Sequence, residues 1–223
     1  MHAAAFSFPA FLPGVAEALV AWPRQIAHVT AAPESDPDAA LMAAFARGDA
    51  NGFEALYAGH KGGVYRYFLR SLRDAGLAEE LAQDVWAAVI RAAAQWRPDA
   101  KFTTWLYRLA HNRLIDHARR SNLVAFSALE SEPGGEDATT VVHEYASDAP
   151  GPDEAVAQRR AARRVVQLVE ALPPAQREAL LLQLEGGLTL EEIAAATGQG
   201  FETVKSRLRY ALAKVRDGMK EFL

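Results

Sequence analysis

Apolar residues recur at helical spacing along most of this chain, and proline and glycine mark where each helix is expected to end. No proline occurs over residues 38–97, where the pattern predicts helices that break at Gly48-Asp49 and near residues 74–76. The last helix of this series is expected over residues 77–96. Its apolar stripe includes Leu81 and Val85, and its other face is polar.

A further helix is expected over residues 103–120, because Pro98 ends the preceding helix and disfavours helical geometry in the residue before it. The residues of this helix expected to face a core are Trp105, Leu109, Leu114 and Ile115. Its polar face is almost entirely basic, whereas a solvated helix surface usually alternates charge signs. Basic groups interleaved with aromatic ones are typical of surfaces that bind single-stranded nucleic acid, because bases stack and phosphates pair.

The C-terminal part predicts one helix over residues 165–172, ended by Pro173-Pro174, a second over residues 175–184, and then a helix-turn-helix. Thr189 followed by Glu192 forms a capping box, which begins the first helix of that motif. Gly198 and Gly200 are expected to end it, because glycine takes positive φ without a steric penalty.

The second helix of the motif carries an apolar stripe, made of Val204, Leu208, Ala211 and Val215. In a helix-turn-helix this helix enters the major groove of DNA. The side chains away from the stripe, which are donors for base edges and phosphates, are Lys205, Ser206, Arg207, Arg209 and Tyr210. The alternative is a helical hairpin whose basic face is only solvated.

Charge is distributed unevenly along the 223 residues, although the net charge is only −4. Residues 121–158 contain no Lys or Arg and many acidic residues, together with Pro133-Gly134-Gly135 and Pro150-Gly151-Pro152. This composition predicts a flexible acidic linker over residues 122–158. The segments on either side are strongly basic, so the sequence predicts an all-α fold of two helical domains joined by this linker.

Residues 1–37 are rich in Ala and Pro and are expected to form a mobile extension. A short helix over residues 15–22 and docking of the apolar side chains on a partner are both compatible with this composition. No apolar run approaches the roughly 20 residues of a membrane span. The segment also lacks the positively charged start of a signal peptide. These features predict a cytoplasmic protein with no membrane span.

No pattern points to catalysis. The chain has no cysteine, which excludes a thiolate zinc site and a cysteine nucleophile. His111 and His117 do not have the i, i+4 spacing of a helical metal pair. No glycine-rich phosphate loop follows a strand, and no pair of carboxylates sits in an apolar setting. We therefore expect neither an enzyme nor a bound cofactor or metal ion.

Three stretches resemble extracytoplasmic-function (ECF) sigma factors, which are bacterial transcription-initiation subunits. Residues 78–86 (AEELAQDVW) resemble the family's segment that grips the clamp helices of RNA polymerase, and residues 102–117 (FTTWLYRLAHNRLIDH) resemble its helix that melts and reads the proximal promoter element. Residues 172–178 (LPPAQRE) and 203–208 (TVKSRL) resemble its domain that reads the distal element. The stretches occur in the order found in the family.

This resemblance implies a sigma region 2-like domain over residues 38–121 and a sigma region 4-like helix-turn-helix domain over residues 159–223. It implies promoter recognition and DNA opening for RNA polymerase, with no catalysis by this chain. The implied partners are the RNA polymerase core, held through the clamp helices of its largest subunit, promoter DNA and an anti-sigma factor.

The residue pattern and the resemblance together give three candidate surfaces. The distal-element residues are Thr203, Lys205, Ser206, Arg207, Arg209 and Tyr210. The proximal-element residues are Lys101, Phe102, Trp105, Arg108, Asn112, Arg113, Asp116, Arg119 and Arg120. The residues expected to bind core polymerase are Glu80, Leu81, Gln83, Asp84 and Trp86.

Two other functions compete with this interpretation, a stand-alone helix-turn-helix repressor and a helical adaptor that binds only protein. A repressor leaves the basic helix over residues 103–120 and the acidic face around Asp84 without a role. Residues 1–37 precede the usual start of the family pattern, so they are either a genuine appendage or the result of a wrongly chosen upstream start codon.

Overall fold

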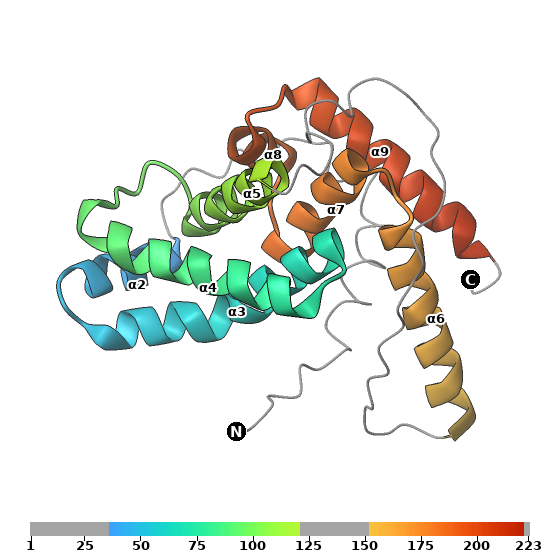
Figure 1. The fold of residues 1–223 in the computed structure, drawn as a ribbon, viewed down its shortest axis with the longest axis horizontal. Helices are drawn as coiled ribbons and strands as arrows, with labels where there is room; N and C mark the ends of the chain where they lie inside the picture. The colour runs from blue at the N-terminus through green and yellow to red at the C-terminus, as the bar shows by residue number, and fades with distance from the viewer. Residues whose placement is uncertain (1–35, 121–151, 221–223) are drawn as a thin grey trace.

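The computed structural model describes residues 36–120 and 152–220, and every regular element in these ranges is helical (Figure 1). The N-terminal unit consists of α2 (Pro37–Ala46), α3 (Ala50–Leu72), α4 (Ala75–Ala92), the short 3-10 helix η2 (Ala93–Gln95) and α5 (Phe102–Arg120). The C-terminal unit consists of α6 (Pro152–Glu170), α7 (Pro174–Gly186), α8 (Leu190–Thr197) and α9 (Phe201–Gly218). The predicted all-α fold is confirmed.

Aspartate side chains fix where the first three of these helices begin. Asp36 accepts a hydrogen bond from the backbone N–H of Asp38 (3.1 Å), and Asp49 accepts one from Asn51 (3.0 Å). Asp74 caps α4 in the same way. Each carboxylate satisfies a free N–H group of the first turn and lies at the positive end of the helix dipole. Because Asp74 is a cap, α4 begins at Ala75, earlier than predicted, and it gives way to η2 before the predicted end at Trp96.

The buried side chains of the two units form one continuous hydrophobic core. Leu56, Phe68 and Leu106 of the N-terminal unit belong to the same cluster as Leu180 and Leu208 of the C-terminal unit. The join is made by α3 and α5, which pack against α7 and α8. Figure 1 shows α7 and α8 lying between the N-terminal unit and α9. The two units are therefore packed against each other in this structure.

Two predicted segments fall mainly outside the described residues. Of the linker predicted over residues 122–158, the described part begins at Pro152, and it is the first part of α6 rather than linker. Of the extension predicted over residues 1–37, the described part is Asp36 and Pro37, which form the cap and the first residue of α2. The helix considered over residues 15–22 also lies outside the described residues.

Candidate nucleic-acid interface

The capping box that the sequence predicts is present at the start of α8. The Thr189 hydroxyl accepts a hydrogen bond from the backbone N–H of Glu192 (3.2 Å), and the Glu192 carboxylate accepts one from the backbone N–H of Thr189 (2.8 Å). Gly198 ends α8 with φ of 69°, which only glycine adopts without strain. The prediction that Gly200 also takes positive φ is wrong, because Gly200 is the extended residue before α9 (φ −69°).

The apolar stripe of α9 is buried as predicted, from Val204 to Val215. On the remaining surface Thr203, Arg209 and Tyr210 are exposed, and Lys205, Ser206 and Arg207 are half-buried. The Arg209 guanidinium lies 5.0 Å from the centre of the Tyr210 ring, and Lys205 lies 5.8 Å from the centre of the Phe201 ring. Three of the six predicted distal-element residues, Lys205, Arg209 and Tyr210, thus place cations beside aromatic rings on the surface of α9.

The predicted proximal-element residues divide into an exposed group and a covered group. The exposed side chains are Arg108, Asn112, Asp116, Arg119 and Arg120, and the half-buried ones are Lys101, Trp105 and Arg113. Phe102 is completely buried, so the expectation that it contacts nucleic acid directly is wrong in this arrangement. Its ring instead supports Trp105, at a centre-to-centre distance of 5.9 Å.

The buried face of α5 differs from the one predicted. Leu114 is buried as expected, whereas Trp105, Leu109 and Ile115 are only half-buried. The side chains that fill the core are Phe102, Leu106, Tyr107, Ala110, Leu114 and Ala118. The cause is that α5 packs against the N-terminal helices on one side and against α7 and α8 on the other. Tyr107, whose ring is polar at one end, is buried between these layers.

Two tryptophans flank the exposed loop over residues 97–100, which leads into α5. Trp96 lies directly before this loop and Trp105 in the first turn of α5, with ring centres 6.4 Å apart in an edge-on arrangement. Both are half-buried, so part of each ring is accessible. A partly exposed aromatic pair beside basic side chains is a surface on which an unstacked base can lie.

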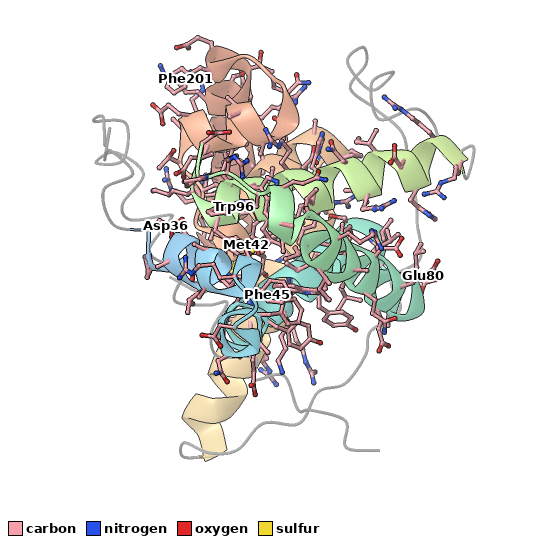
Figure 2. The ribbon with its side chains drawn as sticks, turned by 90° about the vertical axis from the view of Figure 1, so that its left-hand side faces the viewer. Asp36, Met42, Phe45, Glu80, Trp96 and Phe201 are labelled. Atoms are coloured by element: carbon pink, nitrogen blue, oxygen red, sulfur yellow. The ribbon has the colours of Figure 1, made fainter. Side chains whose placement is uncertain are left out.

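The predicted polymerase-binding residues lie on α4, and three of the five are accessible. Glu80 and Gln83 are exposed and Asp84 is half-buried, whereas Leu81 and Trp86 are buried in the N-terminal unit. The prediction that those two contact a partner is therefore wrong for this arrangement. Figure 2 places Glu80 at one margin of the molecule, away from Phe201 at the start of α9.

Ile90 was missed by sequence reasoning, although it is half exposed (50%). It lies two helical turns after Gln83 on α4, so both side chains share one face. The sequence could have indicated Ile90, because an apolar residue stands there on a helix face that is otherwise polar. Ile90 therefore adds apolar area to the otherwise polar outer face of α4.

A buried polar cluster joins the two units, and sequence reasoning also missed it. The Glu185 carboxylate of α7 lies 2.7 Å from Arg66 Nε and 3.5 Å from Arg70 Nε, both on α3. Tyr107 Oη donates a hydrogen bond to the Glu185 backbone carbonyl (2.7 Å). Burial raises the pKa of Glu185, and the two guanidinium groups act against that shift.

A second carboxylate of α7 makes a similar contact two turns earlier. Glu178 Oε1 lies 2.5 Å from His111 Nδ1 of α5 and accepts a hydrogen bond from Tyr67 Oη of α3 (3.1 Å). Burial and the neighbouring Glu178 carboxylate both raise the pKa of Tyr67. The sequence signal for this cluster is the seven-residue spacing of Glu178 and Glu185, which places two acids on one face of α7.

Two further features describe how closely the units approach. Lys101 Nζ, at the end of the loop before α5, lies 3.0 Å from Glu192 Oε1 at the start of α8. Gly63 lies where α3 meets α7, and a Cβ atom there would be 2.6 Å from Tyr107 Oη and 2.9 Å from the Glu185 carbonyl oxygen. The part of α5 that begins the candidate proximal-element surface is thus in contact with the helix-turn-helix.

Within residues 36–120 and 152–220, no group of three or more His, Asp and Glu side chains is placed so that it could hold a metal ion. No helix in those ranges combines the length and apolarity that a membrane span requires.

Comparisons with known proteins cover both units. The model of sigma-70 region 2 matches residues 56–123, and that of sigma-70 region 4 matches residues 162–215. The ECF RNA polymerase sigma factor SigK of Mycobacterium ulcerans (strain Agy99) is 33% identical over 184 residues, covering 82% of this chain and 94% of the relative. SigK of Mycolicibacterium vanbaalenii is 34% identical over 178 residues, covering 79% and 86%. The chain belongs to the ECF sigma factor family.

Two solved structures share the fold of this sigma factor. CnrH in complex with the cytosolic domain of CnrY has a TM-score of 0.56 at 22% identity and covers 82% of this chain and 96% of that one. The sigma factor RpoE in complex with the anti-sigma factor NepR from Bartonella quintana has a TM-score of 0.56 at 18% identity, covering 75% and 96%. As an ECF sigma factor, the protein directs RNA polymerase to promoters.

Proposed function

We propose that three exposed surfaces of this sigma factor carry three separate tasks in initiation. The observation that carries the proposal is that α9, α5 and α4 each present a group of accessible polar side chains, and that these groups differ in chemistry. The surface of α9 reads the distal promoter element as duplex DNA. Its exposed Arg209, backed by the Tyr210 ring, suits a base edge or a phosphate in the major groove.

The start of α5 and the loop before it hold the proximal element after the strands separate. Extruding a base from the stack costs a few kcal/mol, which a pocket must offset by stacking and hydrogen bonds. Trp96 and Trp105 supply ring surface, and the exposed Arg108 and Asn112 supply donors on the adjoining turns of α5. This surface therefore helps to open the promoter.

The outer face of α4 binds the clamp helices of the largest polymerase subunit. Glu80, Gln83 and Asp84 provide acidic and polar groups, and Ile90 provides apolar area on the same face. Within the described residues neither Glu80 nor Asp84 forms a salt bridge, so both carboxylates can pair with basic groups of a partner. Such pairs set orientation and partner choice at an interface.

The remaining assignments follow from the family. The chain acts in the cytoplasm as a non-catalytic subunit, and an anti-sigma factor controls it. The RpoE neighbour is in complex with an anti-sigma factor, which supports this assignment. Two weak promoter readers on one chain gain affinity from their effective concentration, because binding of one confines the other near its site.

Gel shift and run-off transcription with purified core polymerase test the proposal. We expect tight binding to a cognate promoter fragment, and a run-off product, only when chain and core are both present. Tight promoter binding without core is the result for a stand-alone repressor, and no binding in either condition is the result for a protein adaptor. Either of these outcomes contradicts the proposal.

A further inference from the structure

The N-terminus of α5 is capped by a residue from another helix. The residue before this helix is Lys101, whose ammonium group is only a donor and cannot cap free N–H groups. The acceptor is Asp36, whose Oδ2 atom receives a hydrogen bond from the backbone N–H of Phe102 at 2.7 Å. The two residues are 66 positions apart in the chain, so this is a tertiary contact.

The same carboxylate also caps its own helix. Asp36 Oδ1 accepts a hydrogen bond from the backbone N–H of Asp38 (3.1 Å) in the first turn of α2. One side chain therefore closes the N-termini of α2 and α5 together. Both helices stabilise the negative charge of Asp36, because each has free N–H groups in its first turn and the positive end of its dipole at this position.

Two further contacts, both made by His60 of α3, support the first. Asp38 Oδ2 lies 2.8 Å from His60 Nε2 of α3, and the His60 ring lies 5.6 Å from the Phe102 ring. Phe102 is thus held through its backbone by Asp36 and through its ring by His60. Figure 2 shows Asp36 at the start of α2, on the side of the molecule that also carries Trp96. This side carries the loop that α5 follows.

We propose that Asp36 is a positioning residue for promoter opening. By fixing the backbone of Phe102, it fixes the end of the loop over residues 97–101 and the first turn of α5, which carries Trp105. The inference rests on the proposed role of that loop and helix in holding an unstacked base. Asp36 lies well before residue 56, where the match to the region 2 model begins.

The physical reason is preorganisation. With the Asp36 contact present, the tryptophan platform is in place before the DNA opens. Without it, the free-energy cost of ordering the loop end and the first turn of α5 has to be offset by the binding of the base. This cost lowers the equilibrium constant for promoter opening. On a promoter that is already open, transcription depends less on the opening equilibrium, so the contribution of Asp36 to transcription is smaller.

Asp49 provides a matched control. It is also an aspartate that caps a helix, and its carboxylate accepts a hydrogen bond from the backbone N–H of Asn51 at 3.0 Å, but it has no contact with α5. Asp36→Ala and Asp49→Ala therefore each remove the cap of the helix that follows them, and Asp36→Ala also removes the cap of α5. Only the first removes the support of the loop.

The experiment is run-off transcription by the holoenzyme from two templates that share one promoter, a fully paired duplex and a version with a pre-opened bubble. For Asp36→Ala we expect a roughly 3- to 30-fold loss on the duplex, the equilibrium factor for losing one cap, and a clearly smaller loss on the bubble. For Asp49→Ala we expect the same relative activity on both templates. Permanganate reactivity of promoter thymines should fall with the duplex activity of Asp36→Ala.

Asp36→Asn is the conservative variant. Its amide has a single acceptor oxygen, so it retains one of the two caps and should fall between wild type and Asp36→Ala. If Asp36→Ala fails to fold, the comparison between the duplex and the bubble template is made with Asp36→Asn. Equal losses on both templates, or a duplex activity like that of Asp49→Ala, overturn the inference. Absence of promoter-dependent run-off from the wild type contradicts the proposed function instead.

Discussion

His111 of α5 and Glu178 of α7 approach within 2.5 Å across the boundary between the two units. The contact ties the helix proposed to read the proximal element directly to the C-terminal unit. Both side chains are largely buried, with 13% and 6% of their surface exposed. Tyr67, which is fully buried, shares the same carboxylate.

Replacing Glu178 should weaken this joint. Glu178→Ala leaves the buried Tyr67 hydroxyl without its acceptor and the His111 ring without its partner, and we expect a loss of about 1–3 kcal/mol in the free energy of unfolding. Urea denaturation followed by circular dichroism measures it. Glu191→Ala is the control, because Glu191 is exposed on α8 and should change stability by less than about 0.5 kcal/mol. Equal stability of the two variants contradicts the prediction.

The raised pKa of Glu185 predicts a specific pH dependence. The folded chain holds this proton more tightly than the unfolded chain, in which the pKa is about 4.3. The contribution of Glu185 to the free energy of unfolding therefore falls as the pH rises from that value through the raised folded-state pKa.

Glu185→Gln cannot ionise and removes this contribution. The difference in stability, wild type minus variant, should thus decrease with rising pH across that window. Urea midpoints of both proteins at several pH values, from about 4 to about 7, measure this difference. A difference that stays constant or grows with pH is inconsistent with net stabilisation of the protonated form by burial.

Arg209 should contribute to promoter sequence recognition. Arg209→Ala is expected to lower holoenzyme affinity for a cognate promoter by about 1–3 kcal/mol, the usual cost of losing a base contact, with little effect on scrambled DNA. Fluorescence anisotropy with both DNAs measures this. Lys220→Ala is the control, because Lys220 lies beyond the end of α9 and pairs with Asp217 at 3.0 Å. Uniform weakening on both DNAs, with a salt slope lower by about one unit, would instead assign Arg209 to a phosphate.

Reversing the charge of Asp84 should separate polymerase binding from folding. A solvated face tolerates Asp84→Arg within about 0.5 kcal/mol of stability, whereas a like-charge contact with basic clamp helices costs several kcal/mol. We expect nearly unchanged thermal unfolding together with loss of co-purification with core polymerase. Asp217→Arg makes the same reversal on an exposed side chain of α9 and should leave co-purification intact. If the Asp84→Arg chain still binds core as the wild type does, the face of α4 is only solvated.

Features set by neighbouring residues were predictable from the sequence. The Thr189 capping box and the buried stripe of α9 depend on residues within a few positions of each other, so their spacing contains the information. Contacts between distant residues were not predictable. His111 and Glu178 are 67 positions apart, and Asp36 was assigned to a mobile extension because nothing near it indicates its contact with Phe102.

The buried face of α5 was also not predictable from the sequence. Its periodicity was read for a helix with a single core side, and this assigned Trp105 and Leu109 to the interior. The helix has neighbours on two sides, and the core is filled by Leu106 and Tyr107 instead. How many sides of a helix are covered is decided by tertiary packing, which helical spacing alone does not contain.

The bare backbone at Gly63 makes the joint between the units sensitive to volume as well as charge. A methyl group there would press on the Glu185 carbonyl, which belongs to the backbone of α7 and cannot swing aside as the end of a flexible side chain does. Gly63→Ala would therefore create a steric conflict between α3 and α7, while all charged side chains between the two units remain. One added carbon atom would therefore force α3 and α7 to shift relative to each other, while the charges between the two units stay the same.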